Sequence, residues 1–261
     1  MGKVIAIANQ KGGVGKTTTA VNLAAALGEL GQRVLLTDVD PQGNATSGMG
    51  VNKRKLPKST YDILIGQAAA RDVLVHTQFQ NVDILPANIE LAGAEIELVD
   101  TEHREEMLKR TFLPVREQYD YILIDCPPSL GLITLNALSA ADTLLIPAQC
   151  EYYALEGLSQ LIATVRMVKR LYNPSIEIEG VLLTMFDGRL NLTMQVVQEI
   201  KKFFPRKVYK TVVPRNVRIS EAPSFGQPVL YYDGHSRGSE AYRELALEIE
   251  EQNAEKRGTA S

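Results

Sequence analysis

The sequence predicts an α/β fold, a doubly wound and mostly parallel sheet with helices on both faces. Short apolar runs alternate with longer segments of helical periodicity, which favours right-handed βαβ crossovers. The runs are apolar at consecutive positions, as in strands that helices cover on both sides. The first of these runs breaks into a glycine-rich loop and then a helix.

The first element covers residues 4–18, VIAIANQKGGVGKTT. Residues 4–8 are apolar on both faces and are expected to form the first, central strand. Gly12, Gly13 and Gly15 allow positive φ angles and bring consecutive N–H groups close to an anion. The following helix adds its dipole, so the loop predicts a nucleotide phosphate site. No side chain larger than hydrogen is expected to fit there.

The end of the loop carries the charged and hydroxyl groups of such a site. Lys16 supplies a charge for the β- and γ-phosphates, and the Thr17 hydroxyl is placed to ligate Mg²⁺. Gln10 replaces the first glycine of the general pattern GxxxxGK(S/T), and a second lysine, Lys11, precedes Gly12. This deviant form, KGGxGK(S/T), resembles the signature of the ParA/MinD family of Walker-type ATPases.

In that family the extra lysine reaches across a nucleotide-sandwiched dimer to the partner's phosphates. The resemblance therefore implies an ATP-dependent homodimer in which Lys11 acts in trans, with Lys16 as the second catalytic lysine and with ATP and Mg²⁺ as cofactors. The loop residues expected to bind the nucleotide are Lys11, Gly12, Gly13, Val14, Gly15, Lys16, Thr17 and Thr18.

A helix over residues 17–30, ending at Gly31, and a buried strand over residues 33–38 come next. The strand delivers Asp38 and Asp40 to the crevice where open parallel sheets bind ligands. Hydrolysis needs a group that positions water in line with the γ-phosphate, and a carboxylate beside the metal can do so. In the family that the chain resembles, the second aspartate of DxDPQ has this role. Asp40 is thus the candidate catalytic carboxylate and Asp38 lies nearer the Mg²⁺; the alternative is an ordinary Asp-Pro turn.

Residues 51–116 contain fewer signals. Lys53 to Lys58 form a small basic cluster that is typical of a solvated loop. We expect a short helix over residues 61–65, a strand over 82–87 that stops at its proline, and helical periodicity over 88–110.

The next strong signal is residues 121–128, an apolar strand that ends in Asp125. It reads as a Walker B strand, whose aspartate can hold Mg²⁺ through a water while Thr17 binds the ion directly. The predicted metal set is therefore Thr17, Asp38 and Asp125. The alternative for Asp125 is that it only caps a helix that begins near Ser129.

Two more strands, at residues 143–147 and 180–184, flank a helix over 154–171. The late segments LLTMFDGRLNL and KVYKTVVPRNVRISEAPSFGQPV are similar to the chromosomal ParA (Soj) branch of the family, and the resemblance covers about residues 1–250. In that branch the VPRN turn helps to enclose the adenine, which implies base contacts from Pro214, Arg215 and Asn216.

The stretch from residue 189 to 218 is strongly basic, with eight basic residues and one acid, Glu199, giving +7 in a chain of net charge −3. Any nucleic-acid binding must come from such a local patch. A solvated helix face explains the lysines well, whereas the arginines, bracketed by apolar residues, favour a phosphate-binding role. The DNA-binding candidates are Arg189, Arg218, Lys201 and Lys202.

Composition is that of an ordinary globular protein, with 45% hydrophobic and 23% charged residues. We expect one P-loop ATPase domain over residues 1–250 and a polar tail over 251–261. Cys126 and Cys150 lie in apolar stretches and read as reduced core residues of a cytosolic protein. No signal segment precedes the first strand, and no apolar run reaches the ~18 residues of a membrane span.

The resemblance implies a cytoplasmic, nucleoid-associated ATPase of chromosome partitioning. ATP would drive the homodimer, the dimer would bind double-stranded DNA without sequence choice, and a ParB-like (Spo0J-like) DNA-binding partner would stimulate hydrolysis.

Two alternatives stay open from the residues alone. A MinD-like membrane-associated ATPase needs a C-terminal amphipathic helix with large apolar residues, and residues 250–261 contain no Leu, Ile, Val, Phe or Trp. No membrane anchor is therefore expected. A metabolic P-loop enzyme, or an electron carrier of the nitrogenase-reductase type, could use the same loop, although the carrier needs paired cluster cysteines that Cys126 and Cys150 do not resemble.

Overall fold

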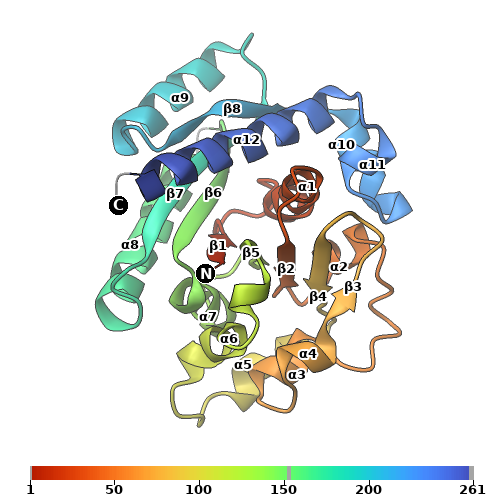
Figure 1. Cartoon of the computed structure of the whole chain (residues 1–261). Coiled ribbons are helices and arrows are strands. Elements are labelled where there is room, and N and C mark those ends of the chain that lie inside the picture. Colours follow the sequence, from red (N-terminus) through yellow and green to blue (C-terminus); the bar gives the residue numbers. More distant parts are fainter. Residues whose placement is uncertain (1, 152–153, 259–261) are drawn as a thin grey trace.

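The computed structural model describes residues 2–151 and 154–258. These residues contain an eight-stranded sheet with helices on both faces, in the strand order β3-β4-β2-β5-β1-β6-β7-β8 (Figure 1). Neighbouring strands are parallel except β3 and β4, an antiparallel pair at one edge. The predicted fold, a doubly wound and mostly parallel sheet, is confirmed.

The strands are β1 Lys3–Ile7, β2 Val34–Asp38, β3 Val75–His76, β4 Val82–Leu85, β5 Tyr121–Asp125, β6 Thr143–Gln149, β7 Glu177–Phe186 and β8 Val208–Pro214. The helices are α1 Lys16–Glu29, α2 Asn44–Gly48, α3 Thr60–Leu64, α4 Ala70–Val73, α5 Leu91–Glu97, α6 Met107–Phe112, α7 Leu132–Ala140, α8 Ala154–Leu171, α9 Asn191–Phe203, α10 Val217–Glu221, α11 Val229–Tyr232 and α12 Arg237–Gly258. Short 3-10 turns lie at Arg104–Glu106, Arg116–Gln118 and Ala222–Phe225.

The first strand lies in the middle of the sheet, as predicted. β1 pairs with β5 on one side and β6 on the other, so that Ile5 stands opposite Leu123 and Thr143. Successive side chains of a strand point to opposite faces. Val4 and Ala6 accordingly enter one hydrophobic core, and Ile5 and Ile7 enter the other.

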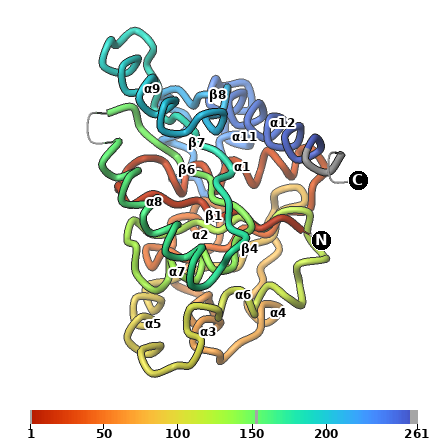
Figure 2. The backbone as a smooth tube through the Cα atoms, turned by 90° about the vertical axis from the view of Figure 1, so that its left-hand side faces the viewer, coloured from red at the N-terminus to blue at the C-terminus, as the bar shows by residue number. Residues whose placement is uncertain are grey.

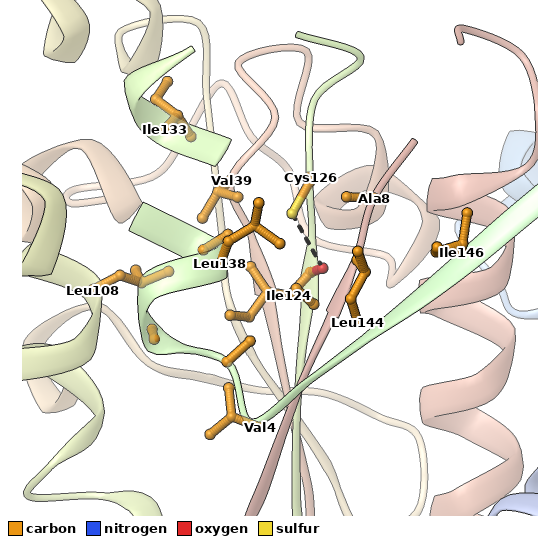
Figure 3. Packing of buried hydrophobic residues seen from close by; sticks show 14 of the residues in the cluster. Val4, Ala8, Val39, Leu108, Ile124, Cys126, Ile133, Leu138, Leu144 and Ile146 are labelled. Atoms are coloured by element: carbon orange, nitrogen blue, oxygen red, sulfur yellow. Dashed lines mark hydrogen bonds between the residues drawn. The ribbon is translucent and has the colours of Figure 1, made fainter. Parts of the chain in front are cut away.

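The two cores explain why every central strand is apolar at consecutive positions. The core around Val4 is closed by apolar side chains of α5, α6, α7, α8 and α9, and Figure 3 shows its centre near Ile124 and Leu144. The core around Ile5 is closed by α1, α11 and α12. Cys126 and Cys150 are free and buried, as predicted. The phosphate loop between β1 and α1 therefore starts from the most buried part of the molecule.

Several elements differ from the expectations. Strand β8 is missing from the predicted elements, because its residues 208–214 alternate buried positions with half-buried or exposed ones at the edge of the sheet and form no continuous apolar run. The helical periodicity over residues 88–110 resolves into two separate helices, α5 and α6, with a 3-10 turn between them. The predicted end of the first helix, by contrast, is confirmed, because Gly31 follows Glu29 and Leu30 with a left-handed φ of 86°.

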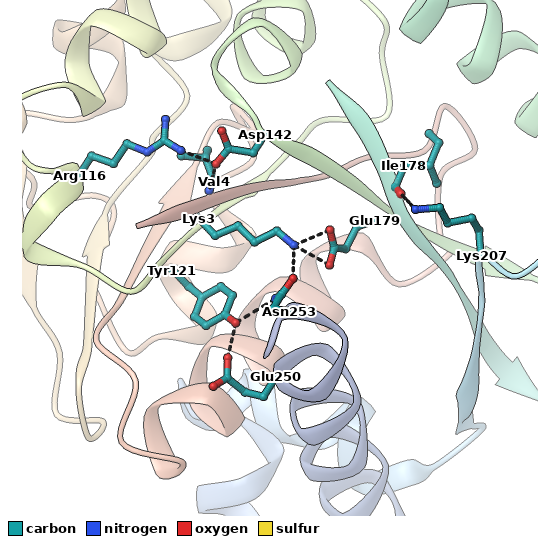
Figure 4. Close-up of polar contacts among 10 residues, drawn as sticks. All are labelled: Lys3, Val4, Arg116, Tyr121, Asp142, Ile178, Glu179, Lys207, Glu250 and Asn253. Carbon is teal, nitrogen blue, oxygen red and sulfur yellow. Dashed lines mark hydrogen bonds and ion pairs between the residues drawn. The ribbon is translucent and has the colours of Figure 1, made fainter. Parts of the chain in front are cut away.

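Both ends of the described chain meet at the amino edge of the sheet (Figure 4). The Lys3 ammonium donates to Glu179 at 2.7 Å and to the Asn253 side chain at 2.5 Å. Asn253 in turn donates to the Tyr121 hydroxyl at 3.0 Å, and that hydroxyl donates to Glu250. Helix α12 thus continues past residue 250, into the segment expected to be a polar tail, and Asn253 is buried in the fold.

Candidate nucleotide site

A cavity of about 820 Å³ opens at the carboxyl edge of the parallel strands. The phosphate loop forms one wall, the turn after β2 forms a second, and the segment that follows β8 forms a third. Of the residues predicted to bind the nucleotide, the cavity is lined by Gly12, Gly13, Gly15, Lys16, Thr17, Thr18, Pro214, Arg215 and Asn216, and also by Asp40. One cavity therefore brings together residues that lie more than 200 positions apart in the sequence.

The three loop glycines have different reasons to be glycine. Gly13 and Gly15 have left-handed φ angles of 73° and 86°, which side chains rarely adopt. Gly12 does not, and a Cβ added to Gly12 or Gly13 would meet no atom within 4 Å. The expectation that no side chain fits here is therefore wrong for the protomer alone. At Gly12, the reason for glycine must lie in what approaches the loop from outside.

Two buried polar side chains fasten the loop from behind, and no sequence motif marks either of them. The Thr184 hydroxyl, at the end of β7, donates to the Val14 carbonyl at 2.8 Å. The Asn9 amide donates to the Pro147 carbonyl of β6 at 2.8 Å and accepts the Lys11 backbone N–H at 3.0 Å. The loop is thus tied to two strands that come much later in the chain.

The two loop lysines have different surroundings. Lys16 is 7% exposed, and its ammonium donates to the Lys11 carbonyl at 3.2 Å across the loop. Burial lowers the pKa of Lys16, while the carboxylates of Asp125 and Asp40 oppose that shift. Lys11 instead points out of the loop and forms an ion pair with Glu151 at 2.5 Å, after β6. Lys11 is therefore partnered within its own protomer.

Asp125 fits a magnesium site. It lies opposite Asp38 in the β2–β5 register, is fully buried, and has no hydrogen-bond partner for either carboxylate oxygen among the described residues. Burial, followed by the charge of Asp38, raises the pKa of Asp125 well above its usual value, and the nearby Thr17 hydroxyl opposes the shift. A buried carboxylate without a partner beside a hydroxyl is a donor set suited to Mg²⁺, a hard cation that prefers oxygen ligands.

Asp38 is already engaged with the protein. Its carboxylate accepts the Thr46 backbone N–H at 2.8 Å, the Thr46 hydroxyl at 2.7 Å and the Asp40 backbone N–H at 3.1 Å. Burial raises the pKa of Asp38 to about 6, and the bonds from Thr46 oppose the shift. The structure thus shows Asp38 fixing the turn that carries Asp40.

Asp40 faces the cavity from that turn. Its backbone is held by Asp38, and its own carboxylate accepts the Gln42 N–H at 2.9 Å. It is 7% exposed, and it lines the same cavity as Lys16 and Thr17. The bond from the Gln42 N–H is also the side-chain bond of an ordinary Asp-Pro turn, so the catalytic role of Asp40 stays a prediction that its place in the cavity lining supports.

The predicted base segment lies on the far wall of the cavity. The Asn216 side chain caps α10 by accepting the Arg218 backbone N–H at 2.8 Å. Thr184, Met185 and Tyr242 line the cavity as well and are absent from the predicted set. Met185 has a left-handed φ of 48°, which turns the chain at the end of β7. The LLTMFD segment contains two of these residues, but in the sequence it carries only a family resemblance and marks no contact with a ligand.

The predicted DNA-binding residues do not form one patch. Arg189 lies before α9, whereas Lys201 and Lys202 lie in its last turn. The length of α9, about 20 Å, therefore separates Arg189 from the two lysines. Arg189 makes a two-pronged ion pair with Asp187 at 2.8 and 2.7 Å, and Arg218 pairs with Glu221 at 2.9 Å.

Asp187, Glu221 and Asp233 lie outside the counted stretch, so the charge count left them out; Asp233 also approaches Arg218, at 3.2 Å. Lys202 pairs at 2.6 Å with Glu199, the one acid that was counted. The expectation that the arginines have no acidic neighbours is therefore wrong.

Residues 2–151 and 154–258 offer no sign of two other kinds of site. In this part of the chain no three His, Cys, Asp or Glu side chains are grouped as they would be around a metal ion. None of its helices combines the length and the hydrophobicity that crossing a membrane requires.

The chain is similar to proteins of known family. The family model described as an AAA domain (AAA_31) matches residues 2–178. The sporulation initiation inhibitor protein Soj of Bacillus subtilis is 61% identical over 249 residues, 95% of this chain and 98% of that protein. The chromosome partitioning protein ParA of Myxococcus xanthus is 52% identical, covering 95% of this chain and 88% of that protein.

A solved structure agrees with these relatives. The cobyrinic acid a,c-diamide synthase of Mycobacterium smegmatis, with bound ADP and magnesium, superimposes with a TM-score of 0.83. It is 39% identical, and the match covers 94% of this chain and 93% of that one.

Proposed function

The chain belongs to the ParA/MinD family of P-loop ATPases, in its Soj branch, and on that premise we propose that it partitions DNA as an ATP-dependent homodimer. It is an ATPase and uses ATP and Mg²⁺, as its relatives and the magnesium-bound and nucleotide-bound M. smegmatis structures indicate. The finer steps, namely dimerisation, DNA binding and partner stimulation, are the content of the proposal.

The observation that carries the proposal is the arrangement of charges around the cavity. Lys16 is buried at the bottom of the loop, Asp40 is fixed on the wall, and Lys11 projects outward beside Gly12. A second lysine that points away from its own loop suits a site completed by another copy of the chain. Open space around Gly12 allows a partner's backbone to approach it closely.

Each residue then has a definite part in hydrolysis. The N–H groups around Gly13 and Gly15 and the Lys16 ammonium bind the phosphates. Thr17 and Asp125 would hold Mg²⁺, which neutralises charge on the phosphate oxygens when bound. Asp40 orients a water in line with the γ-phosphorus, and Lys11 of the partner subunit stabilises the charge that develops there.

DNA binding is proposed for the exposed cations of residues 189–218. The chain's net charge of −3 makes general attraction to DNA weak, so a local surface is required. A dimer presents each cation twice, which converts weak contacts of one protomer into retention on DNA. A ParB-like partner with a short basic N-terminal segment would stimulate hydrolysis at the dimer groove, and nucleoid association would follow.

A second candidate comes from the M. smegmatis relative, whose name is that of a metabolic synthase. Its 39% identity is lower than the 61% shared with Soj, so DNA partitioning is the preferred function. Duplex DNA raising the ATPase rate would favour partitioning, whereas dependence on a carboxylate acceptor and an amide donor would favour the synthase.

The test is DNA retardation with ATP compared with ADP, on two unrelated duplexes. Retention only with ATP, and equal on both duplexes, is expected. Asp40→Ala should stay on DNA with ATP because it dimerises without hydrolysing. Arg189→Glu and Arg218→Glu should weaken binding on both duplexes while dimerisation survives. Equal binding with ATP and ADP would contradict the proposal.

A further inference from the structure

A second cavity, of about 410 Å³, lies at the amino edge of the sheet, between the ends of α8 and α9 and the start of β7. Figure 2 faces the side of the molecule that carries these helices. The floor of this second cavity is apolar and includes Ile162, Val165, Phe203 and Phe204. Phe203 is 49% exposed, although it is a large aromatic side chain. The cavity belongs to no site described so far.

Three cations from two distant segments line this cavity, namely Arg166 and Lys169 of α8 and Lys207 after α9. Three more are close to lining residues in the sequence: Arg170 in α8, Lys201 near the end of α9, and Arg206. We call these six residues the amino-edge cluster. Among the described residues none of the six has an ion-pair partner, and Glu177 is the one acid that lines the cavity.

Lys201, Arg206 and Lys207 of the cluster belong to the counted basic stretch, whereas Arg166, Lys169 and Arg170 lie outside it. Arg189, Arg218 and Lys202 each have an acidic partner within 3 Å. In the cluster, the Lys207 ammonium donates to the Ile178 carbonyl at 2.8 Å, which is a neutral partner (Figure 4). Among the described residues no ion pair offsets the positive charge of the cluster, and Glu177 is the one acid in the cavity lining.

Helix dipoles explain only half of the cluster. Lys169, Arg170 and Lys201 lie in the last turns of α8 and α9, where cations offset the negative end of a helix. Arg166 lies a turn earlier, and Arg206 and Lys207 lie beyond α9. Arg206 is held in a left-handed turn with a φ of 62°, directly before Lys207 in the cavity lining. The helix dipoles therefore do not explain why Arg166 and Lys207 meet at one cavity, with Arg206 next to Lys207 in the chain.

We propose that the amino-edge cluster contacts the phosphates of duplex DNA, as a surface additional to Arg189 and Arg218. Several lysines and arginines without acidic partners are suited to binding a polyanion, and their contacts with phosphates do not depend on the base sequence of the DNA. The apolar floor supports the aliphatic stems of the long side chains and leaves their charged ends at the rim. The inference rests on the proposed function and specifies which surface carries it.

The cluster is well separated from the nucleotide. Glu177 lines the cluster's cavity and Thr184 lines the nucleotide cavity, seven residues further along the same strand. At roughly 3.3 Å per residue this is about 23 Å. Charge changes in the cluster should therefore leave the basal ATPase rate and nucleotide affinity unchanged.

The experiment measures retention on a non-specific duplex with ATP, at several salt concentrations, for the full chain. The test variant is Lys169→Gln/Arg206→Gln, and the matched control is Arg71→Gln/Lys109→Gln, two exposed cations elsewhere. Each lost phosphate contact reduces the slope of log K against log salt by about 0.9, so the test variant should lose about 1.8 for each protomer. We expect the control to keep the slope of the parent.

The outcomes separate the inference from the proposed function. If the parent does not bind DNA with ATP, the proposed function fails. If the parent binds and the test variant keeps the parent's slope, the amino-edge cluster does not contact DNA. Vesicles of phosphatidylglycerol and phosphatidylcholine complete the test: binding that the test variant loses on vesicles, with an unchanged slope on DNA, would overturn the inference in favour of a membrane surface.

Discussion

The ammonium of Lys11 lies 2.5 Å from the carboxylate of Glu151, in the same protomer. The family resemblance assigns this lysine to the partner's phosphates. In this structure it instead forms an ion pair within its own protomer, with a residue that closely follows β6. The two side chains are 29% and 48% exposed, so the pair is solvated and easily exchanged. Dimerisation would require Lys11 to leave Glu151.

Glu151→Gln should therefore favour the dimer. A partly exposed ion pair is worth about 0–1 kcal/mol, so the ATP-dependent dimer should tighten by up to about fivefold. Analytical ultracentrifugation with ATP measures the change, and Lys11→Ala in the same background serves as the control because it removes both partners of the pair. Weaker dimerisation of Glu151→Gln would mean that Glu151 supports the interface.

Gly12→Val should fold and bind nucleotide normally but remain a monomer with ATP. A Cβ at Gly12 meets nothing within 4 Å in the protomer, so the change should not disturb the fold, and we expect the defect at the surface of a partner protomer. The matched change is Gly15→Val. Because Gly15 has a φ of 86°, that change should strain the loop and weaken nucleotide binding itself. Nucleotide affinity and the sedimentation coefficient, measured together, distinguish the two, and a Gly12→Val dimer would end the argument for a sandwich.

Asp125→Asn should make the nucleotide-free protein more stable and inactive. The pKa of Asp125 is raised by burial, so the folded state disfavours its charge, and this cost grows as pH rises above the usual carboxyl value. Removing a buried charge without a partner is worth on the order of 1–3 kcal/mol. The gain in thermal midpoint should grow as pH rises above the usual carboxyl value and shrink as pH falls back toward it. Calorimetry at several pH values would contradict the prediction if the gain grew toward acid.

Thr184→Val should lower nucleotide affinity, because it removes the hydroxyl that holds the Val14 carbonyl and keeps the shape of the side chain. A net hydrogen bond of about 0.5–1.5 kcal/mol corresponds to roughly two- to tenfold in affinity. Thr184→Ser keeps the hydroxyl and should restore binding. If valine binds nucleotide as the parent does and serine binds it more weakly, the Thr184 methyl group matters instead of the hydroxyl.

The parts of the molecule whose chemistry is local could be predicted from the sequence. The loop, its lysines and the ends of β2 and β5 are contiguous motifs. Lys16 and Asp40 could therefore be assigned to one cavity from the order of residues alone. Asp125 could be assigned in the same way to the strand end beside Asp38. The strands that bear them are buried on both faces, and a continuous apolar run is a strong signal.

What could not be predicted depends on contacts between distant segments. Thr184 and Asn9 fasten the loop through single hydrogen bonds that no pattern marks. The counted basic stretch stopped two residues short of Asp187 and three short of Glu221, and it excluded Arg166 and Lys169 on the neighbouring helix. The net charge of a sequence stretch is a poor guide to the charge of a surface, because the fold places residues from other parts of the chain next to that stretch.

The two hydrogen bonds that hold the phosphate loop also determine when, during synthesis on the ribosome, the chain becomes able to bind nucleotide. The loop is among the first residues to be synthesised, yet Pro147 and Thr184, which hold it, are added more than 130 residues later. A nascent chain arrested before Thr184 should therefore carry the complete glycine-rich motif and still fail to retain ATP. Retention should begin only after β7 has left the exit tunnel and paired with β6, which nucleotide crosslinking to arrested chains of increasing length would measure. Nucleotide capture thus reports that the far half of the sheet has assembled, and it cannot serve as an early nucleus for folding.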